Sequence, residues 1–345
     1  MLRRIFHVLG NLLALLTGVG LLARFVPPDM MWPPTLIGLM LPVLLLLTAL
    51  FTALMLYRRR WRAVVIPSLI LLLAFSVLSR LFAFGSSVET PAAGETLTIA
   101  TNNARGFKND AWVDVEKKEV KRVISQLGAD VLLLQESGSD AEAGGHSYVP
   151  SILAGGPYFA HLHPKDRTIA TYAENLKTIA TSVKGFNGYT VVDVNTSLGT
   201  IRFINAHLQS NQISGLAGKL GKDKNVRDGL DRAESMFRSY GRSARTRARQ
   251  AEEILRYVEE SPHPVIVGGD FNDVPTSYTY QRVLSPRLRD AWTTAGFGLG
   301  TTFTGPLPGL RIDFLMVDTS FTIREVKRFE TGYSDHRGLR MVISK

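Results

Sequence analysis

The sequence predicts an α/β protein in which three membrane-spanning helices precede a soluble domain. The 345-residue chain concentrates its apolar residues in the first 85 positions, in three long runs. Beyond residue 95, short apolar runs alternate with helical patterns, and most of these runs end in polar residues. We therefore divide the chain into a transmembrane anchor (1–84), a linker (85–95) and a soluble domain (96–345).

The three apolar runs cover residues 5–22, 35–57 and 64–78. About 20 apolar residues, at a helical rise of about 1.5 Å each, span a hydrocarbon core of roughly 30 Å. The alternative is a signal peptide followed by one buried helical hairpin. The first run lacks a small-x-small cleavage site and two more spans follow it, which favours three membrane helices. Pro42 predicts a kink in the second helix.

Charged residues predict the orientation of the anchor. Arg3 and Arg4 precede the first run, four arginines lie within residues 58–62, and the first loop, 25–34, carries only Asp29. Because loops rich in Lys and Arg stay in the cytoplasm, the soluble domain is expected on the outer face. Its linker of roughly 10 residues is rich in Gly, Ser, Pro and Ala and reaches at most about 35 Å.

The first half of the soluble domain has two strands with polar residues at their ends. A strand at 96–101 is followed by Asn103 and Arg105, and then by a helix at 112–127 with one apolar face. A second buried strand ends directly before Glu136. An acid in that position is unusual unless it is solvated or bound to something.

Two later strands end in the same way. His207 follows a half-buried strand at 200–206. The apolar strand 265–267 stops at a glycine pair, and Asp270 and Asn272 lie on its exit turn. A carboxylate beside an amide can present a proton acceptor next to an orienting donor, although these residues are also ordinary turn formers.

The end of the chain adds two acids and a histidine. Asp313 lies among apolar neighbours in a strand at 311–317, where an acid needs a partner. Asp335 and His336 precede the last strand, 339–343. If these strands share a sheet edge, all of these polar groups converge. Carboxylates with other oxygen ligands suit a hard cation such as Mg²⁺, and a histidine paired with a buried acid suits phosphate chemistry.

One basic segment has two interpretations. Residues 214–250 carry ten Lys or Arg and four Asp or Glu in a chain whose formal charge is +10. The segment is either a solvated helical face or a basic surface for anionic lipid headgroups or nucleic acid. Phe237 and Tyr240 are its only aromatic residues, fewer than a single-strand binder needs. The absence of cysteine excludes a disulfide partner and Cys-ligated zinc.

The ordered set of motifs resembles the endonuclease/exonuclease/phosphatase superfamily over residues 96–345. The motifs are Thr-Asn-Asn-Ala-Arg-Gly, Leu-Gln-Glu, Asn-Ala-His-Leu-Gln, Gly-Asp-Phe-Asn-Asp, Arg-Ile-Asp-Phe and Ser-Asp-His. The resemblance implies a four-layer α/β sandwich, in which two packed mixed sheets are flanked by helices and the active site lies at one edge. It also implies a metal-dependent hydrolase acting on phosphate ester bonds.

The resemblance implies a metal site. Glu136 would be the main ligand of Mg²⁺, or of Mn²⁺ in its place, with Asn103 beside it and Asp335 supporting the metal region. Apart from the resemblance, Arg105 could hold the substrate phosphate.

The same resemblance implies the catalytic residues. Asp270 would handle the proton of the attacking water, and Asn272 would orient the phosphate. His336, held by Asp313, would contact the phosphate, and His207 would be a second phosphate-binding histidine. Hydrolysis would proceed by in-line attack of water on phosphorus.

Departures from the family pattern narrow the function. The apurinic endonucleases of the superfamily have a tyrosine where this chain has His207, which argues against abasic-site repair. The His207-Leu208-Gln209 triplet is closer to the sphingomyelinase and general phosphodiesterase branches. The three spans resemble bacterial membrane-bound members of the teicoplanin-resistance type, which are thought to act on phosphorylated lipids at the outer face.

The sequence leaves three candidate functions to compare. The first is a phosphoesterase in the bacterial inner (plasma) membrane that acts on a phospholipid or polyprenyl phosphate, with its catalytic domain outside. The second is a membrane-tethered nuclease that cleaves DNA. The third, a silent module that only binds a partner or lipid, is disfavoured by the intact set of acids and histidines. The sequence leaves the headgroup, the cleaved bond, one or two metal ions and the oligomeric state open.

Overall fold

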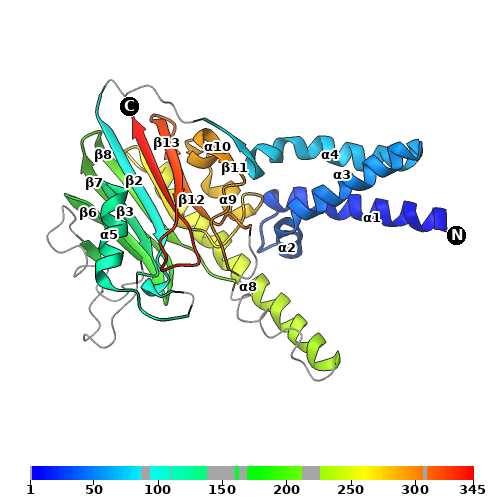
Figure 1. Cartoon of the computed structure of the whole chain (residues 1–345), viewed down its shortest axis with the longest axis horizontal. Coiled ribbons are helices and arrows are strands. Elements are labelled where there is room, and N and C mark those ends of the chain that lie inside the picture. Colours follow the sequence, from blue (N-terminus) through cyan, green and yellow to red (C-terminus); the bar gives the residue numbers. More distant parts are fainter. Residues whose placement is uncertain are drawn as a thin grey trace.

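The computed structural model describes residues 2–86, 94–109, 111–137, 160–162, 169–211, 226–305 and 309–345. The anchor begins the chain, and its helices extend away from an α/β domain (Figure 1). Its elements are α1 (Leu2–Leu22), η1 (Ala23–Phe25), α2 (Pro33–Leu39), α3 (Leu41–Tyr57) and α4 (Trp61–Leu81).

Two segments of the anchor are long and apolar enough to cross a membrane by themselves, Phe6–Phe25 and Trp61–Leu81. The expected second span is broken, because α2 and α3 meet at an angle of 67°. The kink predicted at Pro42 is therefore a full break at Met40, and Pro42 lies in the first turn of α3. Proline suits that turn because its missing N–H needs no partner there. If the bent pair counts as one span, the anchor has three.

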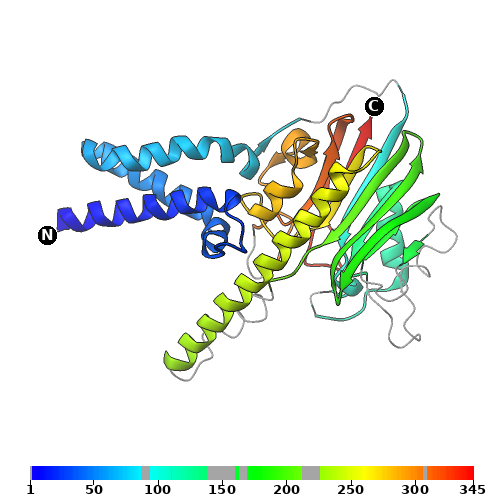
Figure 2. The same ribbon diagram turned by 180° about the vertical axis from the view of Figure 1, so that it is seen from behind.

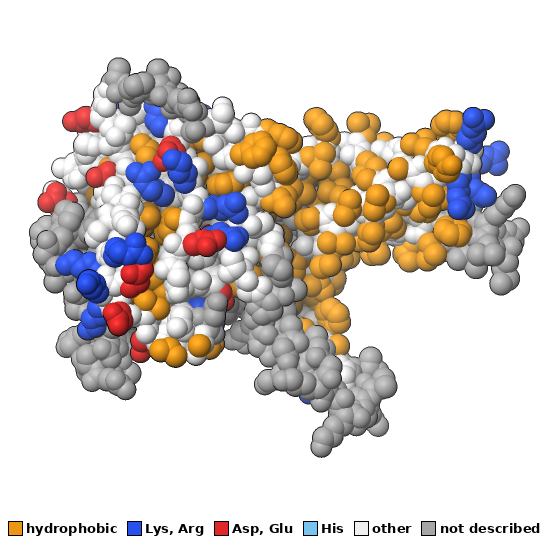
Figure 3. Space-filling view, viewed as in Figure 1, with side chains coloured by type: hydrophobic (Ala, Val, Ile, Leu, Met, Phe, Trp, Pro, Cys, Tyr) orange, Lys and Arg blue, Asp and Glu red, His pale blue; other side chains and the backbone are white. Residues whose placement is uncertain are grey.

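The helices α1, α3 and α4 lie side by side, and α3 runs antiparallel to the other two (Figure 1). Thr17 on α1 and Thr48 on α3 share a buried hydrogen bond of 2.8 Å. The N-terminus and the α3–α4 turn lie at the end far from the domain. Figure 3 shows basic side chains gathered at this far end, where Arg58 and Arg62 are exposed. The opposite end meets the domain.

The domain contains two six-stranded mixed sheets. The first has the order β10-β12-β9-β8-β7-β6. Its strands are β6 (Leu176–Lys184), β7 (Asn187–Thr196), β8 (Gly199–His207), β9 (Val265–Asp270), β10 (Leu288–Asp290) and β12 (Asp313–Asp318). The second has the order β13-β14-β2-β3-β5-β4. Its strands are β2 (Thr96–Asn103), β3 (Val131–Gln135), β4 (Ala160–Leu162), β5 (Ile169–Tyr172), β13 (Thr322–Phe329) and β14 (Gly338–Ser344).

Apolar faces hold the layers together. Ile99 and Leu133 of the second sheet pack against Phe203 and Ile266 of the first in one core cluster. Helix α5 (Lys117–Leu127) covers the outer face of the second sheet, and α8 (Val226–Glu259) covers that of the first. The order helix, sheet, sheet, helix confirms the four-layer α/β sandwich that the motifs implied. The short helices α9 (Tyr278–Val283) and α10 (Ala291–Ala295) lie near the anchor (Figure 2).

The register of the strands brings the motifs to one edge. In the parallel pair β2–β3, Asn103 lies opposite Gln135, one residue before Glu136. In the parallel pair β8–β9, His207 lies opposite Asp270, and Asp270 also lies opposite Asp313 of β12. Because parallel strands end at the same edge, the polar residues that follow them converge, as the sequence predicts.

The anchor docks directly onto the domain. Thr276 donates its hydroxyl to the carbonyl of Gly38 at 3.0 Å, and Arg311 donates Nη2 to the carbonyl of Arg80 at 2.9 Å. A two-residue strand, β1 (Ala83–Phe84), pairs with β11 (Phe297–Gly298) of the domain. Part of the expected linker, residues 87–93, lies outside the described residues. Besides the linker, these contacts hold the domain against the anchor.

Candidate active site

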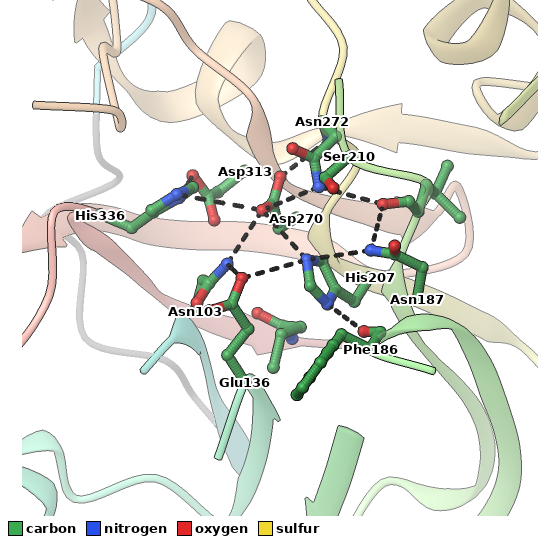
Figure 4. Close-up of polar contacts among 12 residues, drawn as sticks. Asn103, Glu136, Phe186, Asn187, His207, Ser210, Asp270, Asn272, Asp313 and His336 are labelled. Carbon is green, nitrogen blue, oxygen red and sulfur yellow. Dashed lines mark hydrogen bonds and ion pairs between the residues drawn. The ribbon is translucent and has the colours of Figure 1, made fainter. Parts of the chain in front are cut away.

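Asp270 is the centre of the site (Figure 4). It ends β9 after Gly269, whose φ is 134° and where a Cβ would lie 1.9 Å from the carbonyl oxygen of Ala206. Only glycine permits this approach of β8 to β9. The glycine pair that the sequence shows as a turn signal therefore brings the end of β9 close to the end of β8, which carries His207.

Hydrogen bonds hold the Asp270 carboxylate in place. Asn103 donates Nδ2 to Asp270 Oδ2 at 3.0 Å, and Asn272 donates Nδ2 to the same oxygen at 3.2 Å. The Asn272 backbone N–H also donates to Oδ1 at 2.7 Å, with Asn272 in the left-handed region at φ 51°. Burial raises the pKa of Asp270, and the charge of His336 opposes this rise without reversing it. A carboxylate with a raised pKa is a better proton acceptor.

His336 and Asp313 form the pair that the motifs implied. His336 Nδ1 lies 2.9 Å from Asp313 Oδ2, and His336 Nε2 lies 4.0 Å from Asp270 Oδ2. Burial by itself would lower the pKa of His336, but the charges of Asp313 and Asp270 more than offset this and raise it to about 10. The imidazole is therefore charged at neutral pH. Phe303 meets this ring edge-on at 5.1 Å.

His207 is held by a turn that sequence reasoning missed. Its Nδ1 lies 2.6 Å from the carbonyl oxygen of Phe186, which can only accept, so Nδ1 carries the proton. Its Nε2 lies 3.4 Å from Glu136 Oε1 and 3.7 Å from Asp270 Oδ2. The turn that contains Phe186 joins β6 to β7, and no sequence motif links this turn to His207.

Glu136 presents the carboxylate best suited to a divalent cation. It follows β3 with φ at 46°, and its side chain lines a cleft and is 38% exposed. Asn103 donates Nδ2 to Glu136 Oε1 at 3.1 Å. Oxygen ligands with room for water fit Mg²⁺ and Mn²⁺, because Mg²⁺ in particular keeps several waters when it binds protein. Glu136, with Asn103 beside it, would therefore hold the metal.

A second compact group has potential ligand atoms within 4.8 Å of one another, on Asp270, Asp313 and His336. The short contact between His336 Nδ1 and Asp313 is better explained as a hydrogen bond from a charged imidazole. Such a ring has no lone pair for a metal. Glu136, whose carboxylate is more exposed, is therefore the better candidate for a metal ligand.

Arg105 and Asp335 form an ion pair in the same cleft, with Arg105 Nε 3.7 Å from Asp335 Oδ1. The guanidinium of Arg105 also lies over the ring of Trp112, 4.6 Å from its centroid. Asp335 thus lies in the cleft, but its described ion pair is with Arg105, and its support of the metal region stays a prediction. Ser334, which sequence reasoning left without a role, donates to the carbonyl of Asn103 at 2.6 Å and joins the last motif to the first.

The cleft encloses about 270 Å³, and its lining combines polar and apolar side chains. The polar ones include the acids and His336 described above. The apolar and aromatic ones come from segments far apart in the sequence: Leu39, Trp112, Tyr240, Val274, Phe303, Leu310 and Ile312. Leu39 is the last residue of α2, so the anchor contributes to the cleft.

Comparison with known proteins assigns the two parts of the chain separately. The model of the endonuclease/exonuclease/phosphatase family matches residues 101–336, which is more than half of the chain. The model of a domain of unknown function matches residues 3–81. No curated protein matches the chain.

Solved structures similar to this one align mostly over the soluble domain. A humanised D. rerio TDP2 is 16% identical and covers 72% of this chain and 99% of its own, with a TM-score of 0.49. The catalytic domain of human nocturnin with bound sulfate is 17% identical, covering 72% and 94%, with a TM-score of 0.46. A beta toxin from Staphylococcus aureus is 14% identical, covering 71% and 99%, with a TM-score of 0.43. From the match over residues 101–336, the chain belongs to the endonuclease/exonuclease/phosphatase family, and it is a metal-dependent hydrolase of phosphate ester bonds.

Proposed function

We propose that this protein is a membrane-anchored phosphoesterase that hydrolyses a phosphate ester of a lipid, either a phospholipid or a polyprenyl phosphate. The observation that carries the proposal is the position of Leu39. This residue ends α2 of the anchor and lines the same cleft as Glu136, Asp270 and His336. A lipid has a polar head and an apolar chain, and the cleft offers polar groups beside apolar side chains, one of which, Leu39, belongs to the anchor.

The residues of the site have separable tasks in such a reaction. Asp270 accepts a proton from the attacking water, and Asn272, which also lines the cleft, fixes the orientation of that carboxylate. The charged His336 stabilises the negative charge that develops on the phosphoryl oxygens. In its doubly protonated form His207 donates from Nε2 to the phosphate, while its Nδ1 donates to the carbonyl of Phe186. Arg105 adds a further cation at the cleft.

A divalent cation at Glu136, when bound, supplies positive charge that polarises the phosphate oxygens. The chain positions that charge with Asn103, which donates to Glu136 and to Asp270 through the same amide nitrogen. One amide therefore fixes the spacing between the carboxylate that would hold the metal and the carboxylate that accepts the proton.

The position of the anchor supports the proposed location. The basic residues Arg58 and Arg62 lie at the far end of the helices, and the domain lies at the near end (Figure 3). By the preference of basic loops for the cytoplasm, we place the domain on the outer face of a bacterial inner (plasma) membrane.

A second candidate function is a membrane-tethered nuclease. Four arginines of α8, at positions 238, 242, 245 and 249, recur at helical spacing and could contact a phosphate backbone. The cleft is lined by Leu39 and Tyr240, however, and these apolar side chains suit an acyl or prenyl chain better than a phosphate backbone.

The test is hydrolysis by the full-length protein in liposomes, with a panel of phospholipids and polyprenyl phosphates, a soluble phosphodiester and plasmid DNA. Leu39→Asn should reduce hydrolysis of lipids several-fold and leave the soluble phosphodiester unaffected. Leu36→Asn is the matched control, because Leu36 is also on α2 and does not line the cleft. Efficient cutting of DNA with every lipid left intact would replace this proposal with the nuclease.

A further inference from the structure

The N-terminal half of α8 projects beyond the domain that its C-terminal half covers. Ala251, Ile254 and Val258 are buried against the first sheet. Further toward its N-terminus, the helix leaves the sheet and runs past the domain on the side where the anchor lies (Figures 1 and 2). This arm is part of the basic segment 214–250, of which residues 212–225 lie outside the described residues. Neither the fold of the domain nor the active site explains the arm.

The arm is fixed beside α2. The rings of Tyr240 on α8 and Trp32, at the start of α2, lie 6.3 Å apart. Gly241 packs so closely that a Cβ there would lie 2.8 Å from the ring of Trp32. Arg249 and Asp29 add a two-pronged ion pair, with distances of 2.8 and 3.1 Å. The arm therefore starts at the level where the anchor enters the domain.

The face of α8 that packs on α2 continues along the arm. Residues three or four positions apart share a helical face, so Phe237 and Ala233 extend the line of Tyr240 and Ala244. Tyr240 and Ala244 are buried, but Phe237 is 50% exposed.

The neighbouring surface of the anchor is apolar as well. Met30 and Met31, in the loop before α2, are 81% and 52% exposed. Beside the apolar line of α8 runs a basic line of Arg238, Arg242, Arg245 and Arg249, at spacings of four, three and four residues. A helix with an apolar stripe next to a basic stripe is typical of one that lies in the surface of a membrane with anionic lipids.

From this geometry we infer that the N-terminal half of α8 lies in the interface between membrane and water, on the side of the membrane where the soluble domain lies. Phe237 and Ala233 enter the boundary with the acyl chains, and Arg238, Arg242 and Arg245 contact anionic headgroups. The same arm supplies Tyr240 to the cleft, so the cleft opens at the level of the headgroups. A nucleic-acid surface would use the arginines but leave the apolar stripe exposed to water. The inference does not depend on which phosphate ester the enzyme hydrolyses.

The test uses the absence of cysteine from the chain, which makes any introduced cysteine a unique labelling site. Phe237→Cys and Ser235→Cys are each labelled with a nitroxide in the full-length protein in liposomes of phosphatidylglycerol and phosphatidylcholine. Ser235 is the matched control, because it is exposed and about 200° around the helix from Phe237. Collisions with oxygen, which partitions into lipid, and with a water-soluble nickel complex are then measured.

We expect the label at 237 to collide with the nickel complex several-fold less often than the label at 235, and with oxygen more often. Arg238→Gln combined with Arg242→Gln should weaken this difference, as should omission of phosphatidylglycerol. Equal access of nickel to both positions would overturn the inference. Poor access of both reagents to position 237 would also overturn it, since protein would then cover the site. Protection of position 237 by added DNA, without lipid contact, would identify a nucleic-acid surface instead.

Discussion

Asp270 and Asp313 lie directly opposite each other in the antiparallel β9–β12 pair, and each is only 1% exposed. Two ionised carboxylates that are neighbours in a buried site repel each other. His336 lies against both, with Nδ1 at Asp313 and Nε2 towards Asp270. One charged imidazole therefore allows two acids to occupy neighbouring positions, and the Ser-Asp-His motif completes a site that β9 and β12 begin.

Replacement of the proposed proton acceptor should stop the reaction without unfolding the protein. Asp270→Asn keeps the shape of the side chain but cannot accept a proton, and we expect kcat to fall by about 10² or more. Single-turnover hydrolysis and the elution volume of the variant check this. Asp114→Asn, at an exposed acid of the Lys108 ion pair, is the control. Near-normal turnover by Asp270→Asn would show that another group accepts the proton.

Removal of the imidazole should have a comparable effect on catalysis. His336→Ala deletes the charged group that faces the phosphate, so we expect kcat to fall by about 10² or more. Asp313→Asn should lower kcat less, because it leaves the imidazole present and weakens only the contact that orients it. If both variants were as active as the wild type, the His336–Asp313 pair would have only a structural role.

The His336–Asp313 pair should also make stability depend on pH. The pKa of His336 is raised from 6.5 to about 10, so the stabilisation is fully present below pH 6.5 and is lost progressively as the pH rises to about 10. Thermal unfolding of the chelator-treated protein measures this. The difference in melting temperature between wild type and His336→Gln should shrink over that range. A difference that stayed constant would contradict the assigned charge state.

Chelation should abolish activity. We expect EDTA to stop hydrolysis, Mg²⁺ or Mn²⁺ to restore it, and Glu136→Gln to raise the metal concentration needed for half activity. Titration calorimetry with Mg²⁺ gives the affinity independently of turnover. Glu119→Gln, at an exposed acid on α5, serves as the control. Full activity in chelator would remove the metal from the mechanism.

Separation of α8 from α2 should affect lipids more than soluble substrates. A Cβ at position 241 would lie 2.8 Å from the ring of Trp32, so Gly241→Val should push α2 away and move Leu39 from the cleft. We expect hydrolysis of lipids to fall several-fold while that of a soluble phosphodiester persists. Adding Trp32→Ala, which makes room for the valine, should restore part of the loss. An equal fall for both substrates would indicate general damage instead.

The orientation of the anchor can be tested directly. A reporter fused after Lys345 should be active only outside the cytoplasm, because the basic cluster at 58–62 is expected inside. A second reporter that works only in the cytoplasm, fused at the same position, should be inactive. A cytoplasmic result would reverse the orientation and direct attention to intracellular substrates.

The sequence predicted the parts of this site that depend on local pattern. Glu136, His207 and Asp270 each follow an apolar strand, and the ends of such strands meet whenever the strands share a sheet edge. Asp313 was predicted to need a partner because it lies among apolar residues, and His336 is that partner. The four-layer arrangement, in contrast, came from the resemblance of the ordered motifs.

Features that depend on distant contacts were beyond the sequence. Nothing near Leu39 indicates that it reaches a cleft built from the soluble domain, and nothing near Phe186 indicates that its carbonyl orients His207. The break at Met40 was also missed, because a proline that kinks a helix and a proline that starts one look alike in an apolar run. Direct docking of the anchor was missed for a different reason. A linker rich in Gly and Ser suggests a flexible tether, but contacts elsewhere can still hold the two parts together.

The break between α2 and α3 links the cleft to the thickness of the bilayer. Helix α3 has 17 residues and is about 25 Å long, shorter than a hydrocarbon core of roughly 30 Å. A short span accommodates hydrophobic mismatch by thinning the bilayer around it or by shifting its ends. The N-terminal end of α3 is joined through one residue, Met40, to α2, whose last side chain lines the cleft. We expect the enzyme to respond to acyl-chain length in the surrounding lipids even when the substrate is unchanged.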